Sequence, residues 1–443
     1  MLGETKCFQL VDAALGACQS DQAEAILHIT DSALTRFADS AIHQNVSERN
    51  AMLSVRAVLG KKSGVARGNQ LAPQEAQSVA RRAVDLARVS AEDEHFVSLP
   101  GPEPLPEVRT WSDATAASTP ESRAEAVVKI AAIAEKRNGR ASGSFAADTS
   151  EVAIANSLGV RAYFPATDAS LIAVVADDDS SGYADWRGTD LSQLDPEAVA
   201  ETAAAKCADA RGAQAIEPGA YTVILEPLAV GDMLFMLAYM GLGALAVQEG
   251  RSFMAGRIGE KLCGDNITIW DDATDPRQRA VPCDWEGVPK RKLTLIENGV
   301  ARGPAYDSYT ANKEGKQSTG HALPAPNTFG PVPIHLFLRS GDAALDDMIA
   351  STGAGPSGEP AILVTRFHYT NIVHEKRTIF TGMTRDGTFL IESGELSRPV
   401  KNLRFTQSIL DALSNVEIIG RDSHLVEYAH VPALKIANFN VTS

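Results

Sequence analysis

The chain has 443 residues and a formal net charge of −15, so it is long enough for two or three domains, each with its own core. The excess of acidic side chains argues against nucleic acid or an anionic membrane as the main partner, because phosphate groups would repel it. Five cysteines without a CxxC pair predict neither a disulfide framework nor a zinc ribbon, and they fit a reducing cytoplasm.

No stretch of the sequence has the pattern of a signal peptide or a membrane span. Glu4, Lys6 and Asp12 interrupt the region where a signal peptide would be apolar. The longest uncharged apolar run, residues 233–247, is too short to cross a bilayer. We therefore expect a cytoplasmic protein and interpret this run as part of a buried helix.

The first half of the chain holds segregated helix and strand patterns. Helices are expected at residues 4–19, 73–90, 119–137 and 194–210. Short strands are expected at residues 23–30, 32–44, 52–59, 141–145, 151–156, 161–164 and 170–176, with a hairpin turn at 62–64. Four prolines make residues 98–113 a connection. The predicted fold class is α+β, with an N-terminal domain over residues 1–212 in which helices flank an antiparallel sheet.

Strands dominate the second half. After a strand at residues 221–225 and a buried helix at 229–248, apolar and polar residues alternate with a period of two through residues 362–413. Arg385-Asp386-Gly387 and Glu392-Ser393-Gly394 have the composition of turns between strands. We predict a C-terminal domain over residues 213–443 that is mostly antiparallel and curved or barrel-like.

Three long loops interrupt this half, at residues 273–292, 315–333 and 340–360. Loops of this length inside a compact domain often line a functional site. Residues 353–358 fit GxGxxG as a pattern, but they lack the preceding strand and following helix of a phosphate-binding turn. We interpret them as loop.

Several segments resemble the TldD/PmbA family, also described as a modulator of DNA gyrase or metallopeptidase family. They are RFADSAIHQNVSE from residue 36, EGRSFMAGRIGEKL from 249, TRFHYTNIV from 365, TGMTRDGTFLIESGEL from 381, PVKNLRFTQS from 399 and VPALKIANFNVTS from 431. The resemblance spans nearly the whole chain, and it implies that the protein takes part in metallopeptidase activity.

The family's zinc motif is degenerate in this sequence. Catalytic members carry HExxxH on the helix after the first C-terminal strand, where two histidines hold zinc and the glutamate acts as general base. In the matching stretch, residues 223–243, these positions hold Phe235, Met236 and Met240. Neither a phenyl ring nor a thioether is a suitable zinc ligand or base. We therefore assign no catalytic and no metal-binding residue to this chain and expect these side chains to fill a core.

The other candidate ligands and nucleophiles form no recognised motif. Catalytic members take a third zinc ligand, a cysteine, from a region that here, at residues 415–430, holds only His424 and His430. His374-Glu375 lacks the second histidine of a zinc motif. No signature joins Cys263 to His321 as a catalytic pair, and the acidic turn at Asp271, Asp272 and Asp275 lacks the glycine and glutamate of an EF-hand loop.

The resemblance implies the TldE/PmbA type: a non-catalytic subunit of a heterodimeric zinc metallopeptidase that degrades or matures unfolded peptides. Zinc is then expected in a TldD-like partner and not in this chain. A strand-rich domain can bind an extended peptide by strand addition, and Arg366, Arg385 and Arg404 are candidate contacts for its carboxylate or carbonyl groups. A solvated face or internal pairing is the alternative role of these arginines.

Two other functions stay open. One is a homodimeric peptide-binding protein without proteolytic activity. The other is an autonomous hydrolase with a displaced site that uses His368, His374 or His424.

Overall fold

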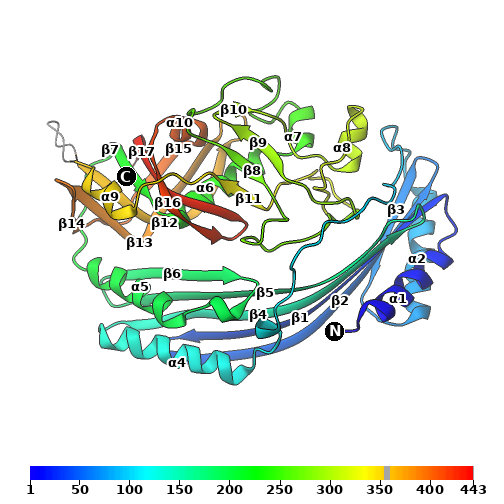
Figure 1. Cartoon of the computed structure of the whole chain (residues 1–443), viewed down its shortest axis with the longest axis horizontal. Coiled ribbons are helices and arrows are strands. Elements are labelled where there is room, and N and C mark those ends of the chain that lie inside the picture. The colour runs from blue at the N-terminus through cyan, green and yellow to red at the C-terminus, as the bar shows by residue number, and fades with distance from the viewer. Residues whose placement is uncertain (354–359, 443) are drawn as a thin grey trace.

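The computed structural model describes residues 1–353 and 360–442, and the chain folds into two β-sheets with helices (Figure 1). Most of the glycine-rich stretch at 353–358 lies outside the described residues. The α+β class predicted from the sequence is confirmed.

The first sheet is antiparallel and has the strand order β3-β2-β1-β4-β5-β6. Its strands are β1 (Gln22–Ala38), β2 (Ala41–Leu59), β3 (Lys62–Gly68), β4 (Arg140–Asn156), β5 (Arg161–Ala176) and β6 (Ser181–Gly188). The prediction of many short strands was wrong, because the short segments merge into long continuous ones. Polar residues that break the sequence pattern, such as Asp31 and Ser32, stay within β1, where Asp31 pairs with Arg49 on β2.

All the helices of this half pack on one face of the first sheet. They are α1 (Glu4–Ala17), α2 (Pro73–Val89), α3 (Asp113–Ala116), α4 (Pro120–Lys136) and α5 (Pro196–Asp209), with a 3-10 turn η1 (Leu191–Gln193). Along β1, Leu27 and Ile29 face α1 and α2, whereas the preceding Ile26 points to the other face and belongs to a separate cluster with Trp285. The opposite face of the sheet is therefore covered by the second half of the chain (Figure 1).

The second sheet has eleven strands, and part of it closes on itself. Its strands are β7 (Gly219–Leu225), β8 (Ile269–Asp271), β9 (Leu293–Glu297), β10 (Val300–Ala301), β11 (Leu336–Leu338), β12 (Ala361–His374), β13 (Ile379–Glu392), β14 (Glu395–Pro399), β15 (Arg404–Ser408), β16 (Val416–Val426) and β17 (Ala429–Val441). The helices between these strands along the chain are α6 (Pro227–Gly241), α7 (Ala244–Gln248), α8 (Ser308–Lys313), α9 (Leu345–Ala350) and α10 (Ile409–Ser414). Because β7 pairs with both β12 and β17, the strands β7, β12, β13, β15 and β17 form a ring. The predicted curved, mostly antiparallel sheet is confirmed, with β7–β12 and β11–β17 as parallel exceptions.

Two local predictions in this half need correction. Arg385-Asp386-Gly387 is no turn: β13 runs through it with a register shift, and Asp386 and Gly387 have φ of 55° and 121°. This is a β-bulge, which needs the same turn-forming residues as a hairpin. The helix expected at 229–248 is broken at Gly243, where a Cβ atom would lie 2.1 Å from the Pro331 carbonyl oxygen. The turn at Ser393 and Gly394 is confirmed.

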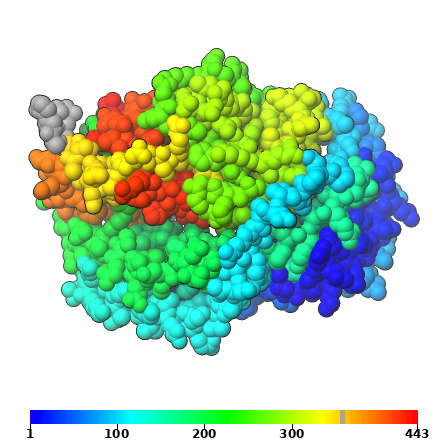
Figure 2. Space-filling view, in the orientation of Figure 1, coloured from blue at the N-terminus to red at the C-terminus, as the bar shows by residue number. Residues whose placement is uncertain are grey.

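The long connection before α3 runs over the surface along both halves of the molecule (Figure 2). The first sheet ends at Gly188, and the second begins at Gly219. The domain division near residue 212 stays a prediction. Within the described ranges, no helix has the length and apolar character needed to cross a membrane.

The close packing of α2 on β3 gives a stability prediction. A Cβ atom at Gly64 would lie 2.2 Å from the Ala87 backbone nitrogen, so Gly64→Ala should lower the free energy of unfolding by ~1–3 kcal/mol. Gly16→Ala is the matched control, because Gly16 lies in α1 with no atom within 4 Å of its added methyl group. Denaturant unfolding should rank Gly16→Ala at or above the wild type, and equal stability of the two variants would contradict this packing.

Candidate functional site

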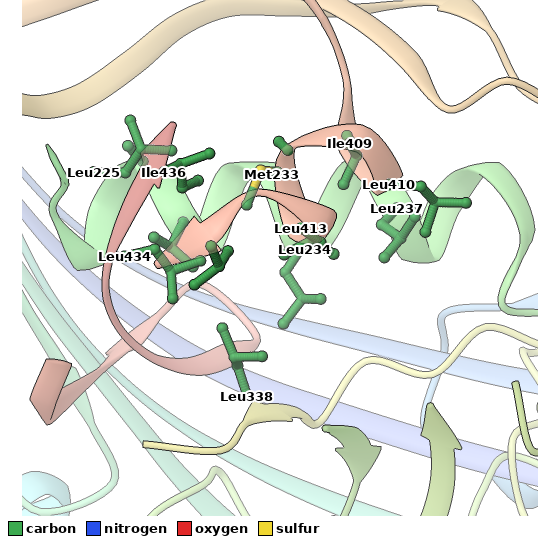
Figure 3. Close-up of a cluster of buried hydrophobic side chains, with 14 of the residues drawn as sticks. Leu225, Met233, Leu234, Leu237, Leu338, Ile409, Leu410, Leu413, Leu434 and Ile436 are labelled. Carbon is green, nitrogen blue, oxygen red and sulfur yellow. The ribbon is translucent and has the colours of Figure 1, made fainter. Parts of the chain in front are cut away.

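Helix α6 is the element on which the family's zinc motif would stand. Pro227 occupies its first turn, where a missing N–H is tolerated, and the Lys206 ammonium group binds the preceding Glu226 carboxylate. Its buried side chains pack with those of β7, β17 and α10 in the main core of the second half (Figure 3). A Cβ atom at Gly231 would lie 2.5 Å from Val426 Cγ1, so α6 lies directly against β16. The helix is therefore held in place along its length.

The three motif positions on α6 have different surroundings. Phe235 is 39% exposed, Met236 is partly buried against the core, and Met240 is fully buried. None of the three side chains offers a nitrogen or oxygen atom. Phe235 and Tyr239 form an exposed aromatic face, and the Tyr239 ring lies 4.8 Å from that of Phe329. Position 240 therefore serves packing, and the outer side of the helix is aromatic.

The candidate histidines are scattered over two hairpins. His368 and His374 lie on β12, and the His374 ring accepts a hydrogen bond from the Arg377 backbone N–H. His424 on β16 and His430 on β17 lie near each other, and burial, assisted by Arg277, lowers the pKa of His430 to about 4. Among the described residues, no group of three or more His, Cys, Asp or Glu side chains could hold a metal ion. The assignment of no metal site stays a prediction.

The three candidate peptide-binding arginines differ in what they contact. The Arg366 guanidinium group donates through Nε to Asp386 at 2.7 Å and lies 4.2 Å from the centre of the Tyr183 ring. Asp386 also accepts a hydrogen bond from Ser181 at 2.6 Å, so this cluster joins β13 to β6 of the first sheet. Arg366 is thus engaged inside the molecule.

Arg385 and Arg404 are more accessible. Arg385 lies 3.8 Å from the same carboxylate and is about half exposed. Arg404, on β15, is exposed. The structure brings Arg366 and Arg385 together at Asp386, and the role of all three in peptide binding stays a prediction.

A cleft of about 520 Å³, lined by residues of β6, α5 and the β16–β17 hairpin, lies beside the start of α6. Asp185, Lys206 and His430 are among its lining residues. Close by, the pKa of Asp232 on α6 is raised to about 7, chiefly by burial, with Arg366 opposing the shift and Glu427 and Asp185 adding to it. This cleft carries ionisable groups of both signs next to the degenerate motif.

The sequence reasoning missed a second buried polar cluster. Asp271 is engaged inside the chain: its Oδ1 accepts a hydrogen bond from His321 Nε2 at 3.0 Å, and both side chains are fully buried. His321 thus pairs with Asp271 and not with Cys263, which is part of the main core. Lys290 and His335 lie in the same cavity as His321. The only sequence signal was the length of the loops that contribute these residues.

The Asp386 cluster gives a stability prediction. Asp386→Asn keeps the shape and tolerates a positive φ, but it removes the charge that balances Arg366, so the free energy of unfolding should fall by ~2 kcal/mol. Arg385→Gln is the control, since this longer and more exposed contact should contribute less than ~1 kcal/mol. A larger loss for the control in urea unfolding would refute the arrangement.

Asp232 gives a prediction about pH. Its pKa in the folded protein is raised from 3.8 to about 7, so the folded state holds this proton more tightly than the unfolded state does. In the wild type, the contribution of Asp232 to the free energy of unfolding is therefore fully present below about pH 4 and is lost as the pH rises through 7. Asp232→Asn, which stays uncharged, should raise the melting temperature more at pH 8 than at pH 5. An identical gain in melting temperature at both pH values would argue against a buried Asp232 carboxyl group with a raised pKa.

Comparison with known proteins places the chain in a family. The PmbA/TldA metallopeptidase central domain matches residues 115–210, and the PmbA/TldA metallopeptidase C-terminal domain matches residues 218–443, which is more than half of the chain.

Among curated relatives, an uncharacterized protein of Methanocaldococcus jannaschii is 35% identical over 175 residues, which are 36% of this chain and 42% of that protein. A metalloprotease of Methanothermobacter thermautotrophicus is 29% identical over 213 residues, 47% of this chain and 44% of its own. The chain thus spans less than half the length of these relatives. The crystal structure of TldE from Thermococcus kodakarensis shares the fold, with a TM-score of 0.88, 21% identity and coverage of 99% of this chain and 100% of that one. The chain therefore belongs to the TldD/PmbA family of metallopeptidases.

Proposed function

We propose that this chain is the non-catalytic, TldE/PmbA-like subunit of a heterodimeric zinc metallopeptidase that degrades or matures unfolded peptides. One observation carries the proposal: α6 bears Phe235, Met236 and Met240 where the catalytic type bears HExxxH. Zinc binding requires nitrogen, oxygen or thiolate ligands, and activation of its bound water requires a base. These three side chains supply neither.

The burial of Met240 supports the same proposal. A metal ligand must point into an open site, whereas Met240 packs among the core residues of α6 and its neighbours. A histidine there would place a polar ring in the core without a partner. On this proposal the zinc belongs to a TldD-like partner, and this chain contributes part of the wall of the peptide chamber.

The outer face of α6 supports contact with a partner. Phe235, Tyr239 and Phe329 are large exposed apolar side chains, and the rings of Tyr239 and Phe329 are in contact in a tilted arrangement. Neighbouring exposed aromatic residues are typical of interfaces. For contact with a peptide, Arg385 and Arg404 are better placed than Arg366, whose guanidinium group is occupied by Asp386.

Native mass spectrometry of the tagged chain purified from its own host tests the proposal. We expect one partner of similar size and one zinc ion per pair, with no zinc on the isolated chain. Tyr239→Asp should weaken the pair at least tenfold, because it places a charge in the aromatic face. Val128→Asp is the matched control, since Val128 is exposed on α4 on the far side of the first sheet, and it should leave the pair intact.

Two other results would replace the proposal. A metal-free homodimer that binds peptides would indicate the binding protein without proteolytic activity. A homodimer with stoichiometric zinc would refute the argument from α6 and turn attention to His368, His374 and His424 as ligands of a displaced site.

A further inference from the structure

A cavity of about 220 Å³ lies between the first sheet and the loops that cover its second face. On the sheet side it is lined by apolar residues of β4 and β5, among them Val152, Ile154 and Phe164. On the loop side it is lined by Trp285 and Ile334. No residue of α6 contributes to it, so it is separate from the degenerate zinc motif and its inference does not depend on the proposed function.

One end of this cavity is polar, and two of its groups lack partners. The Lys290 residue is 5% exposed, and within the described part of the chain its ammonium group makes no ion pair and no hydrogen bond. His335 is 6% exposed, and its Nδ1 atom has no hydrogen-bond partner among residues 1–353 and 360–442. Buried polar groups are rarely left unsatisfied, because each costs the free energy of its lost hydration.

The neighbouring carboxylates, in contrast, are fully engaged. Asp271 accepts hydrogen bonds from His321 at 3.0 Å and from the His335 backbone N–H at 2.7 Å. Asp284 accepts three backbone N–H groups, those of Glu286, Val288 and Ala322, each at 2.9 Å. The chain has thus satisfied its acceptors here, while an ammonium group and an imidazole ring remain available to a ligand.

The charges of the cavity favour an uncharged ligand. Burial raises the pKa of Asp284 to about 7, although the nearby Lys290 charge opposes this shift, whereas burial of Asp271 is outweighed by His321 and Lys290, which together lower the pKa of Asp271. Burial, with Lys290 adding to it, lowers the pKa of His335 to about 3 and also lowers that of His321, which favours the neutral form of both rings. A carboxylate ligand would add negative charge beside the Asp271 carboxylate, and an amine would meet Lys290. The polar end of the cavity therefore lacks hydrogen-bond partners for Lys290 and His335, and it does not lack a charged group.

We propose that this cavity binds one uncharged molecule that combines a ring-sized apolar body with a hydroxyl group, such as a phenol or an aryl alcohol. The hydroxyl oxygen accepts a hydrogen bond from Lys290, and its proton is donated to the His335 ring. A dry cavity of ~150 Å³ holds a benzene molecule, so this larger one holds a ring with a substituent. Trp285 and Phe164 supply aromatic contacts for the ring. A free small molecule and a tyrosine side chain of a peptide offer the same chemistry.

Calorimetric titration of the full chain, with its partner if one co-purifies, tests the proposal with three probes that share a methylphenyl ring and differ in the para group. We expect p-cresol to bind, toluene to bind at least tenfold more weakly because it leaves Lys290 and His335 unsatisfied, and p-toluate to bind at least tenfold more weakly because of its charge. Binding of N-acetyl-tyrosine amide as well as p-cresol would identify a peptide side chain as the source, and binding of p-cresol alone a free small molecule. Equal affinities for p-cresol and toluene would overturn the proposal and indicate an apolar cavity whose polar groups do not contact the ligand. No binding of any probe would also overturn it and indicate a cavity that holds only water.

Two variants separate the cavity from general effects on folding. Ala166→Leu fills the space and should lower the affinity for p-cresol at least tenfold. Ala41→Leu changes an exposed residue at the tip of the β1–β2 hairpin and should leave this affinity unchanged. Lys290→Met should lower the affinity for p-cresol toward that for toluene, because only His335 then contacts the hydroxyl group, and it should leave the affinity for toluene unchanged. Loss of both probes together in a Lys290→Met protein that unfolds at the wild-type temperature would show that Lys290 does not contact the hydroxyl group.

Discussion

The structure depends on how the second face of the first sheet is covered. All helices of the N-terminal half pack on one face, and side chains alternate between faces along every strand, so the other face carries its own apolar residues. Ile26, Val152 and Ile154 on that face form a cluster with Cys283 and Trp285 from a loop far along the chain. The two halves are therefore joined by burial of apolar surface and not only by the connection between them.

Charged contacts lie along the same junction. The Arg56 guanidinium group on β2 binds Glu24 at 3.0 Å within the sheet and Glu286 at 3.3 Å from a covering loop. At the other side of the molecule, Arg366 and Asp386 reach Tyr183 and Ser181 on β6. Because charges and polar groups that leave water must be paired, these contacts fix the relative position of the two halves. The long loops of the second half thus help to cover the second face of the first sheet.

Helix α6 illustrates how one element serves both the core and the surface. Its inner side chains lie among residues of β7, β17 and α10, and this packing sets its place within the closed ring of strands (Figure 3). Its outer side presents Phe235 and Tyr239, where exposed polar residues would be usual for a surface helix. The same helix therefore contributes to the main core and to an exposed aromatic surface.

The sequence by itself determined the family, the α+β class, most helices of the first half and the absence of a zinc motif at positions 235, 236 and 240. These features depend on local sequence: the cap residue Thr119 and Pro120 mark the start of α4, and the residue types alone show that positions 235, 236 and 240 do not hold HExxxH. Only the tertiary structure decided that polar residues such as Asp31 stay inside a long strand, that Asp386 lies in a bulge, and that Arg366 is engaged internally. It also brought His321 to Asp271, fifty positions away along the chain, beside Lys290 and His335. The physical reason is that such contacts join distant segments, so neither partner's local pattern records the other.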